Sequence, residues 1–397
     1  MTALHRFFND GFRVFFTAAA LYAIFAIGVW DVWLIWADRF GAPDMPFAPA
    51  PHLWHAHEMI FGYGTAALAG FFLTAVPNWT GARAAPHVFV AVVAGLWLLG
   101  RVGLWFSGSL SPLLVMGLDL AFVPVLAAKI LTQLLKRPKP QNMLFLAVLA
   151  VLWLGNLFVH LEWAGLAADT AWAGLRAGLL SLIAMIAILG GRVTPAFTKN
   201  AMVQSGTQTG LPRNPTPLTG VTIAAALALP MGYLLSAPAP VQGGIAIIAG
   251  ISALARLALW RTDWTLRKPI LWALHLGYFW LGLGLVLLGL SDFGIGSEIA
   301  AVHLLGIGAV GGMTIAVMSR ATLGHSGRPL VASRAMTIAY GLVALAALLR
   351  WVGSSLPALG NLANWTAGAL WVTAFLLFII SLWSALTGPR LAKEAKP

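Results

Sequence analysis

Residues 269–290 read PILWALHLGYFWLGLGLVLLGL, a run without a single Asp, Glu, Lys or Arg. At about 1.5 Å per residue, a helix of this length crosses the roughly 30 Å hydrocarbon core of a bilayer. The rest of the chain has the same character, since 60% of its 397 residues are hydrophobic, 9% are charged and the mean hydropathy is +0.86. This composition lies far outside the soluble range and indicates a membrane protein.

Eleven further apolar runs are long enough to span, so we predict an all-α polytopic membrane protein with twelve transmembrane helices in a single domain, residues 1–397. The polar segment 192–216 is predicted to be the longest connection. No cleavable signal is expected, because the first apolar run has spanning length and no small-residue cleavage site. The predicted spans are 12–36, 52–76, 86–106, 112–135, 142–162, 174–191, 217–235, 241–261, 269–290, 298–319, 333–353 and 364–386.

Lys and Arg residues fall mainly in alternate loops and at both ends of the chain. Positively charged loops resist translocation, so we expect both termini to be cytoplasmic. Twenty of the 24 basic residues then lie on the cytoplasmic side, the exceptions being Arg39, Arg101, Arg176 and Arg350. The net charge of +12 therefore describes membrane topology and not nucleic-acid binding.

Five of the nine histidines are predicted to share one layer near the outer face. The sequence HLWHAHEM at 52–59 opens the second span, and two further histidines lie near the outer ends of the fifth and tenth spans. Two carboxylates, Glu58 and Glu298, accompany them. Ionisable residues in membrane helices are costly and usually functional, so we favour a metal or cofactor site over isolated interfacial histidines. The five histidines are His52, His55, His57, His160 and His303.

The residue types narrow the kind of site. The chain has no cysteine, so a metal must be held by His, Met or carboxylate, and neutral imidazoles suit copper, zinc or haem iron. His52 and His55 share a helix face while His57 points away, so one helix could serve two sites. Arg101 and Arg350 lie at the same outer depth, and an arginine fork suits haem propionates, although snorkelling to lipid phosphate explains each arginine as well.

The chain also contains weak internal similarity. The second span reads HEMIFGYG from His57 and the tenth HLLGIGAVGG from His303, each with a glycine five residues after the histidine. Arg101 and Arg350 end the third and eleventh spans at matching depths. We therefore expect three four-helix repeats, at about 1–140, 141–266 and 267–397.

The sequences WHAHEMIFGYG, AVPNWTG, GRVTPAFTKN, LHLGYFWLGLGL and AVHLLGIGAVGGMT resemble the NnrS family over nearly the whole chain. The resemblance implies a bacterial inner-membrane protein with haem and copper, produced in response to nitric oxide and protective against nitrosative stress. Haem–copper oxidases offer an analogy, since they also arrange twelve helices as three four-helix units. On this analogy His57 and His303 would bind a haem, expected to be b-type, on its two faces.

The same analogy leaves the copper ligands open. The sixth and seventh spans contain no histidine, so copper or a second haem would have to use His52, His55 and His160, together with His275.

Two classes of function follow from these observations. As an oxidoreductase, the protein would reduce two NO to N₂O with electrons from membrane quinol, and Glu58 and Glu298 would relay protons. As a non-catalytic module, it would bind NO or handle haem and copper. A secondary transporter ranks third, because transporters usually place polar groups near the membrane midplane, whereas this chain concentrates them at one face.

Overall fold

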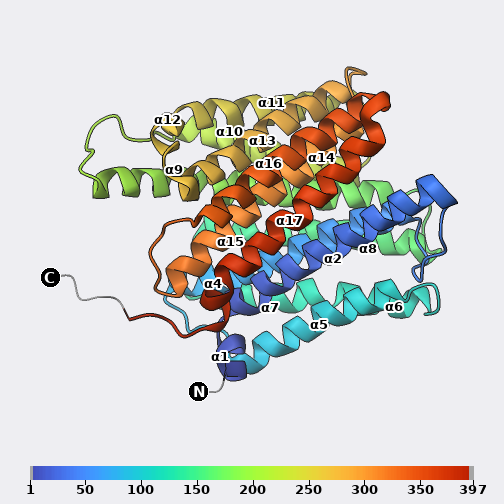
Figure 1. Cartoon of the computed structure of the whole chain (residues 1–397), viewed down its shortest axis with the longest axis horizontal. Coiled ribbons are helices and arrows are strands. Elements are labelled where there is room, and N and C mark those ends of the chain that lie inside the picture. The colour runs from blue at the N-terminus through green and yellow to red at the C-terminus, as the bar shows by residue number, and fades with distance from the viewer. Residues whose placement is uncertain (1–2, 393–397) are drawn as a thin grey trace. The chain divides into compact units, whose positions relative to one another are not determined.

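The computed structural model describes residues 3–392, and every regular element within them is a helix (Figure 1). Twelve helical spans among these residues are long and apolar enough to cross a membrane, which confirms the predicted all-α polytopic fold. The first half of the chain contains α1 (Ala3–Asn9), α2 (Gly11–Phe40), α3 (Pro51–His57), η1 (Glu58–Gly64), α4 (Thr65–Thr80), α5 (His87–Trp105), α6 (Pro112–Leu120), α7 (Phe122–Leu134), α8 (Pro140–Trp163) and α9 (Ala171–Gln204). The second half contains α10 (Thr216–Leu234), α11 (Ala239–Ala258), α12 (Thr262–Thr265), α13 (Pro269–Ser291), α14 (Glu298–His303), η2 (Leu304–Gly311), α15 (Gly312–His325), α16 (Arg334–Ser355), η3 (Pro357–Leu359) and α17 (Gly360–Thr387).

The chain divides into two compact units. The first unit comprises the described residues of Met1–Gly178, Met318–Leu330 and Phe375–Pro397, and the second comprises Leu179–Val317 and Val331–Ala374. The helices α9, α15 and α17 each contribute to both units. The three four-helix repeats stay a prediction.

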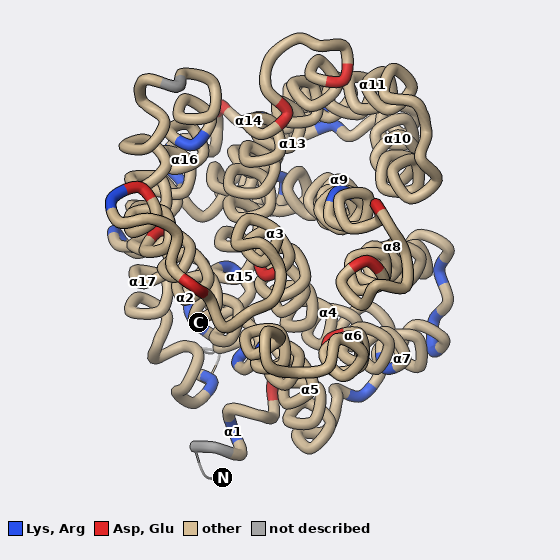
Figure 2. The backbone as a smooth tube through the Cα atoms, turned by 90° about the vertical axis from the view of Figure 1, so that its right-hand side faces the viewer, with Lys and Arg blue, Asp and Glu red and all other residues tan. Residues whose placement is uncertain are grey.

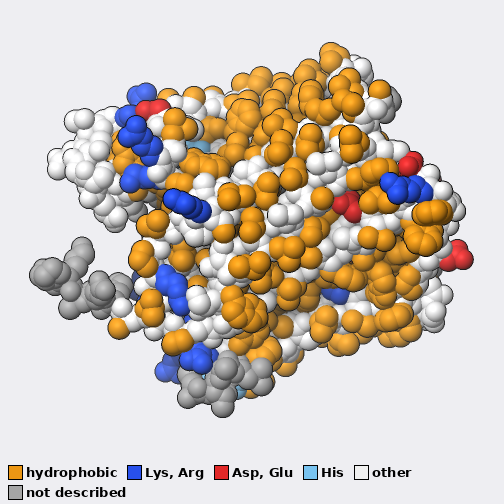
Figure 3. All heavy atoms as spheres, in the orientation of Figure 1, with side chains coloured by type: hydrophobic (Ala, Val, Ile, Leu, Met, Phe, Trp, Pro, Cys, Tyr) orange, Lys and Arg blue, Asp and Glu red, His pale blue; other side chains and the backbone are white. Residues whose placement is uncertain are grey.

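Large hydrophobic side chains cover the outer surfaces of the helices, as a lipid environment requires. Examples are Leu99, Ile251 and Ile380, which are 51%, 57% and 70% exposed. Figure 3 shows hydrophobic side chains over the middle of the helices and basic side chains gathered toward helix ends. Viewed nearly along the helices in Figure 2, charged positions are sparse. The few that are buried therefore need an explanation.

The predicted polar connection 192–216 is wrong over its first half, because α9 continues through Pro195 to Gln204. Proline has no N–H, so it leaves the carbonyl four residues earlier, that of Gly191, without its helical hydrogen bond. This carbonyl accepts instead from Arg256 Nη2 at 2.9 Å and from Asn214 Nδ2 at 3.1 Å. Polar side chains replace the missing backbone donor, so the helix passes through the proline.

The fourth span shows the same compensation. It is divided at Ala121 into α6 and α7, three residues before Pro124. The proline leaves the carbonyl of Leu120 without its helical donor. Trp153 on α8 donates to that carbonyl from Nε1 at 3.0 Å. This contact ties α6 to α8, the two helices that carry part of the site described below.

Arg13 joins the two ends of the chain within the first unit. Its side chain is 1% exposed, and Nη1 donates to the carbonyls of Leu386 and Gly388 at 2.8 Å each and of Ala385 at 3.2 Å. These carbonyls lie at the end of α17, where the last turn of a helix lacks backbone donors. Arg13 therefore caps α17 and fastens it to the start of α2.

We expect Arg13→Met to lower the free energy of unfolding by about 1.5–3 kcal/mol, the usual contribution of a hydrogen bond to a charged group. Methionine retains the apolar stem but leaves the helix end uncapped. Thermal unfolding in detergent measures the effect, with Arg39→Met as a control at an exposed position. Equal stability of the two variants would show that the cap is unimportant.

Two of the spans contain π-helical segments where α-helix was expected. The segment η1 follows His57 directly, and η2 follows His303 directly. A π-helix forms i→i+5 hydrogen bonds and is uncommon outside functional sites. Both segments therefore draw attention to the histidines that precede them.

Candidate metal centre

The order of the spans brings the polar residues of the first unit to one face. His57 and Asp119 lie in the first halves of the second and fourth spans, while Arg101 and His160 lie near the ends of the third and fifth. Consecutive spans joined by short loops run in opposite directions. The start of one span therefore lies at the same depth as the end of the next, and the four side chains meet.

The centre of this group is a set of three donor residues, His57, Asp119 and His160, whose ligand atoms lie within 4.8 Å of one another. Asp119 Oδ2 is 2.8 Å from His160 Nε2 and 3.3 Å from His57 Nε2. The other ring nitrogen of His57, Nδ1, is 2.9 Å from Glu58 Oε1. Both imidazoles thus present Nε2 to the same carboxylate oxygen.

Asn156 completes the polar contacts of this group. Its Nδ2 donates to Asp119 Oδ2 at 2.7 Å, and its Oδ1 lies 2.8 Å from His57 Nε2. Asn156 and His160 are four residues apart on α8, so they share a helix face. One amide thereby orients both the carboxylate and one imidazole.

Arg101 holds two carboxylates at once. Nη1 donates to Glu58 Oε1 and Nη2 forms an ion pair with Asp119 Oδ1.

Two glycines make these close approaches possible. A Cβ at Gly100 would lie 2.9 Å from Asp119 Oδ1, and one at Gly62 would lie 3.2 Å from Arg101 Nη1 and 2.7 Å from an aromatic carbon of Tyr22. A side chain at either position would push the pair apart.

Burial and charge show that this group is not an ordinary interfacial cluster. His57 and Glu58 are 0% exposed, and Arg101, Asp119 and His160 are 5%, 4% and 2% exposed. With neutral imidazoles and both carboxylates ionised, two negative charges face one positive charge. A buried unbalanced charge costs several kcal/mol. One further cation, a metal ion or a proton, would therefore balance the group.

Besides Arg101 Nε, two buried polar atoms of or beside the group have no hydrogen-bond partner. They are Glu58 Oε2 and the indole Nε1 of Trp163, whose ring centroid lies 5.2 Å from that of His57 and 5.7 Å from that of His160. Unpaired buried polar atoms are rare in proteins and often mark the place of a bound ion or molecule. The unpaired indole N–H of Trp163 would suit a small ligand with an acceptor atom beside the imidazoles.

The remaining predicted residues of the first unit lie on aromatic rings. The ring of His55 stacks on Trp30 with centroids 4.7 Å apart, and that of His52 stacks on Trp172 at 5.9 Å. Neither residue belongs to the set of three donors. Their predicted role as metal ligands stays a prediction.

Four predicted residues belong to the second unit. His275 Nε2 lies 2.8 Å from Thr198 Oγ1, and Nδ1 lies 2.9 Å from Thr262 Oγ1, so both nitrogens face hydroxyl groups. Glu298 opens α14, and Arg350 donates to Ser354. The structure therefore brings Glu58, Arg101, His57 and His160 together within the first unit.

His303 has the tautomer of a metal-ligating histidine. Its Nδ1–H donates to the carbonyl of Ile299 at 2.7 Å, which leaves the lone pair on Nε2. A backbone carbonyl on Nδ1 is a common way to orient an imidazole ligand. This feature fits the predicted haem ligand.

The donor set of the first unit fits a metal ion. Two imidazoles and one carboxylate form the set of non-haem iron sites, and imidazole also suits copper and zinc. Because Glu58 faces Nδ1 of His57, the group contains the carboxylate–histidine pair that usually orients a metal ligand. His57 fits an axial haem ligand less well, since both of its nitrogens already face oxygen atoms of the group.

The fold and this site together define a class, a polytopic membrane protein with a buried histidine–carboxylate site suited to a metal ion. A family model described as NnrS protein matches residues 6–390, and the chain belongs to this family. The family comprises haem- and copper-binding membrane proteins of the nitric oxide response. No curated protein matches the sequence.

Proposed function

We propose that His57, Asp119 and His160 bind a copper ion and that the protein uses this centre to reduce nitric oxide. The observation that carries the proposal is the convergence of three buried donor atoms within 4.8 Å. Copper is chosen over iron because the family binds it. Metal analysis of the purified protein distinguishes the two.

The residues around the donors would prepare the site for the ion. With an ion bound, Nδ1–H of His57 would donate to Glu58 Oε1 and leave the lone pair of Nε2 for the metal, while Asn156 Nδ2 donates to the Asp119 carboxylate. Arg101 balances one carboxylate charge so that a cation balances the other. Bound copper would supply an open coordination position for NO and a one-electron redox couple.

The proposed reaction is two NO plus one quinol giving N₂O, water and quinone. The quinol supplies two electrons and two protons. The N–N bond of N₂O forms, and the N–O bond of one of the two NO molecules breaks, its oxygen leaving as water. Glu58 is the first proposed proton carrier, which is supported by the absence of a partner at Oε2 and the contact of Oε1 with His57. Glu298, at the start of α14, is the second proposed proton carrier.

A haem is the second proposed cofactor. His303 would be one ligand through Nε2, and the predicted second ligand, His57, is assigned to copper in this proposal. Arg350 and Arg101 would contact its propionates, the latter in addition to Glu58 and Asp119. The proposed type is haem b.

We also propose that the protein resides in a bacterial inner membrane with both termini in the cytoplasm. The distribution of Lys and Arg supports this orientation, because twenty of the 24 lie on the side of the termini. The metal centre then lies near the periplasmic face. Fusion of a reporter to either terminus tests the orientation.

In liposomes containing reduced quinol, we expect the metal-loaded protein to consume NO over many turnovers and to release one N₂O for every two NO. Gas analysis of both species measures this ratio. NO loss that ends at one or two equivalents per protein, without N₂O, would contradict turnover and identify a non-catalytic NO-binding protein. Protein stripped of metal by a chelator is the control.

A further inference from the structure

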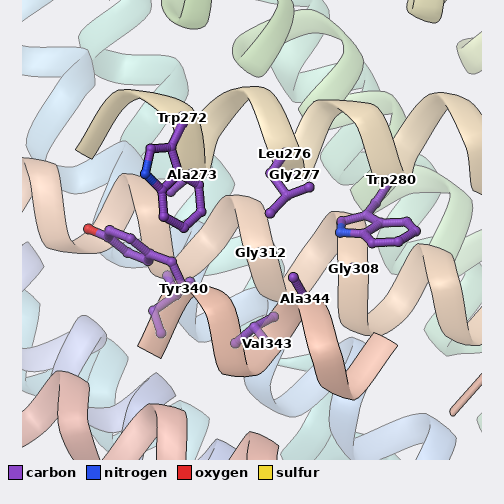
Figure 4. Close-up of a pocket in the computed structure, with 11 residues that line it drawn as sticks. Trp272, Ala273, Leu276, Gly277, Trp280, Gly308, Gly312, Tyr340, Val343 and Ala344 are labelled. Atoms are coloured by element: carbon purple, nitrogen blue, oxygen red, sulfur yellow. The ribbon is translucent and has the colours of Figure 1, made fainter. Parts of the chain in front are cut away.

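A small cavity lies in the second unit between α13, the start of α15 and α16 (Figure 4). The volume open to the centre of a water-sized sphere is about 10 Å³. Trp272, Leu276 and Trp280 line it from α13, and Tyr340 and Ala344 line it from α16. Gly308 and Gly312 also line the cavity, and a Cβ at Gly308 would lie 2.6 Å from the indole ring of Trp280, so this glycine lets Trp280 pack against the tenth span.

One polar atom of the lining lacks a partner. Trp280 is 6% exposed, and its indole Nε1 has no hydrogen-bond acceptor. In Figure 4 this nitrogen points toward the space between Leu276 and Gly308, while the hydroxyl of Tyr340 points away from it. The cavity thus combines apolar walls with a single inward donor.

This combination disfavours water as the occupant. A volume of about 10–15 Å³ of this kind is enough for one water, but a buried water needs two to four polar partners. The side chains that line the cavity supply one. A small uncharged molecule with a weak acceptor atom satisfies the indole N–H and leaves no polar group of its own unpaired.

The depth of the cavity identifies where such a molecule comes from. Trp280 is the middle residue of α13, Pro269–Ser291, so the cavity lies near the centre of the membrane. Leu276, Gly312 and Ala344 are half-buried, so the cavity reaches the surface of the helices there. Small apolar gases concentrate in hydrocarbon because transfer from water is favourable.

We propose that this cavity is a docking site for a diatomic gas that enters from the lipid, with the indole N–H of Trp280 as its hydrogen-bond donor. The inference rests on the proposed function in taking NO as that gas. It adds a site that is separate from the metal ligands of the first unit. The cavity would hold NO at the depth where NO is most concentrated.

Two glycine substitutions in the same span test the site. A Cβ at Gly312 would fill part of the cavity and meet nothing closer than Gly277 Cα at 3.6 Å, so Gly312→Ala should fold. Gly306→Ala is the matched control, since a Cβ there has no neighbour within 4 Å and Gly306 does not line the cavity.

Xenon-pressurised crystals report occupancy of the cavity independently of the metal. We expect xenon in the wild type and in Gly306→Ala, and about tenfold weaker binding, or ~1.4 kcal/mol, in Gly312→Ala.

The second measurement uses NO and metal-free protein. NO is a radical and broadens nearby resonances, so the ¹H–¹⁵N signal of the Trp280 indole, assigned by its absence in Trp280→Phe, should broaden more than that of lipid-exposed Trp383. Gly312→Ala should remove the difference. Absence of xenon from the wild type, or equal broadening of the two indoles, would overturn the proposal. Neither readout depends on turnover, so a failure of the reductase function is distinguished from a failure of the site.

Discussion

Asp119→Asn is expected to weaken metal binding by about 100-fold or more, since loss of even an indirect partner of a metal ligand costs 10–100-fold. The substitution keeps the shape of the side chain and removes its charge. Asp119 Oδ2 is the oxygen that faces Nε2 of both His57 and His160. In the variant, the amide of the new asparagine places either a neutral oxygen or an N–H donor where Asp119 Oδ2 carries negative charge. It also leaves the Arg101 charge balanced by Glu58 alone, so that a bound cation no longer completes the charge.

Metal titration of apoprotein in detergent, followed by competition with a chelator, measures this affinity. Asp169→Asn is the matched control, because Asp169 is exposed and its φ of 57° is tolerated by Asn as well as by Asp. His160→Ala should show a loss of the same order. Unchanged metal affinity in both Asp119→Asn and His160→Ala would rule out the proposed donor set.

Arg101→Met is expected to lower the free energy of unfolding by about 3–5 kcal/mol, the cost of leaving buried charges without their partner. Arg101 is 5% exposed and contacts both Glu58 and Asp119, which are 0% and 4% exposed. Methionine fills much of the same volume without a charge. The carboxylates of Glu58 and Asp119 would then repel each other inside the protein, and this repulsion would destabilise the packing of the helices that carry them.

A double substitution separates charge from packing. Arg101→Met combined with Glu58→Gln removes one of the two carboxylates, so part of the stability should return. Arg176→Met is the control for loss of an arginine whose guanidinium lies over an aromatic ring, 5.9 Å from the centroid of Trp172. If Arg101→Met and Arg176→Met destabilise the protein equally in thermal unfolding, the ion pairs of Arg101 contribute little.

Much of the site could be predicted from residue type and depth. The sequence predicts one layer for His57, Glu58, Arg101 and His160, because charged and titratable groups at membrane depth require partners and the alternation of spans shows which ends coincide. The structure brings these four together. It adds Asp119 and Asn156, which are not among the predicted site residues. Asp119 is the one acidic residue of its span, and that alone was a sufficient signal.

The contacts themselves could not be predicted. Which nitrogen of His57 faces Asp119, and that Arg101 contacts two carboxylates of the protein, depend on helix rotation and on the close approach that Gly100 permits. Residue spacing within one helix specifies a face only relative to that helix. The rotation of one helix against another is decided by packing over the whole interface.

The sequence alone determined the class of fold, the number of spans and the depth of the polar residues, because hydrophobic length and charge are sums over local residues and the bilayer acts on each span separately. The tertiary structure decided the rest. The carbonyl freed by Pro195 is satisfied by Arg256 and Asn214, which come from other parts of the chain, so α9 extends past the expected end. The π-helices after His57 and His303 and the meeting of His57, Asp119 and His160 likewise depend on contacts between spans, which no local pattern contains.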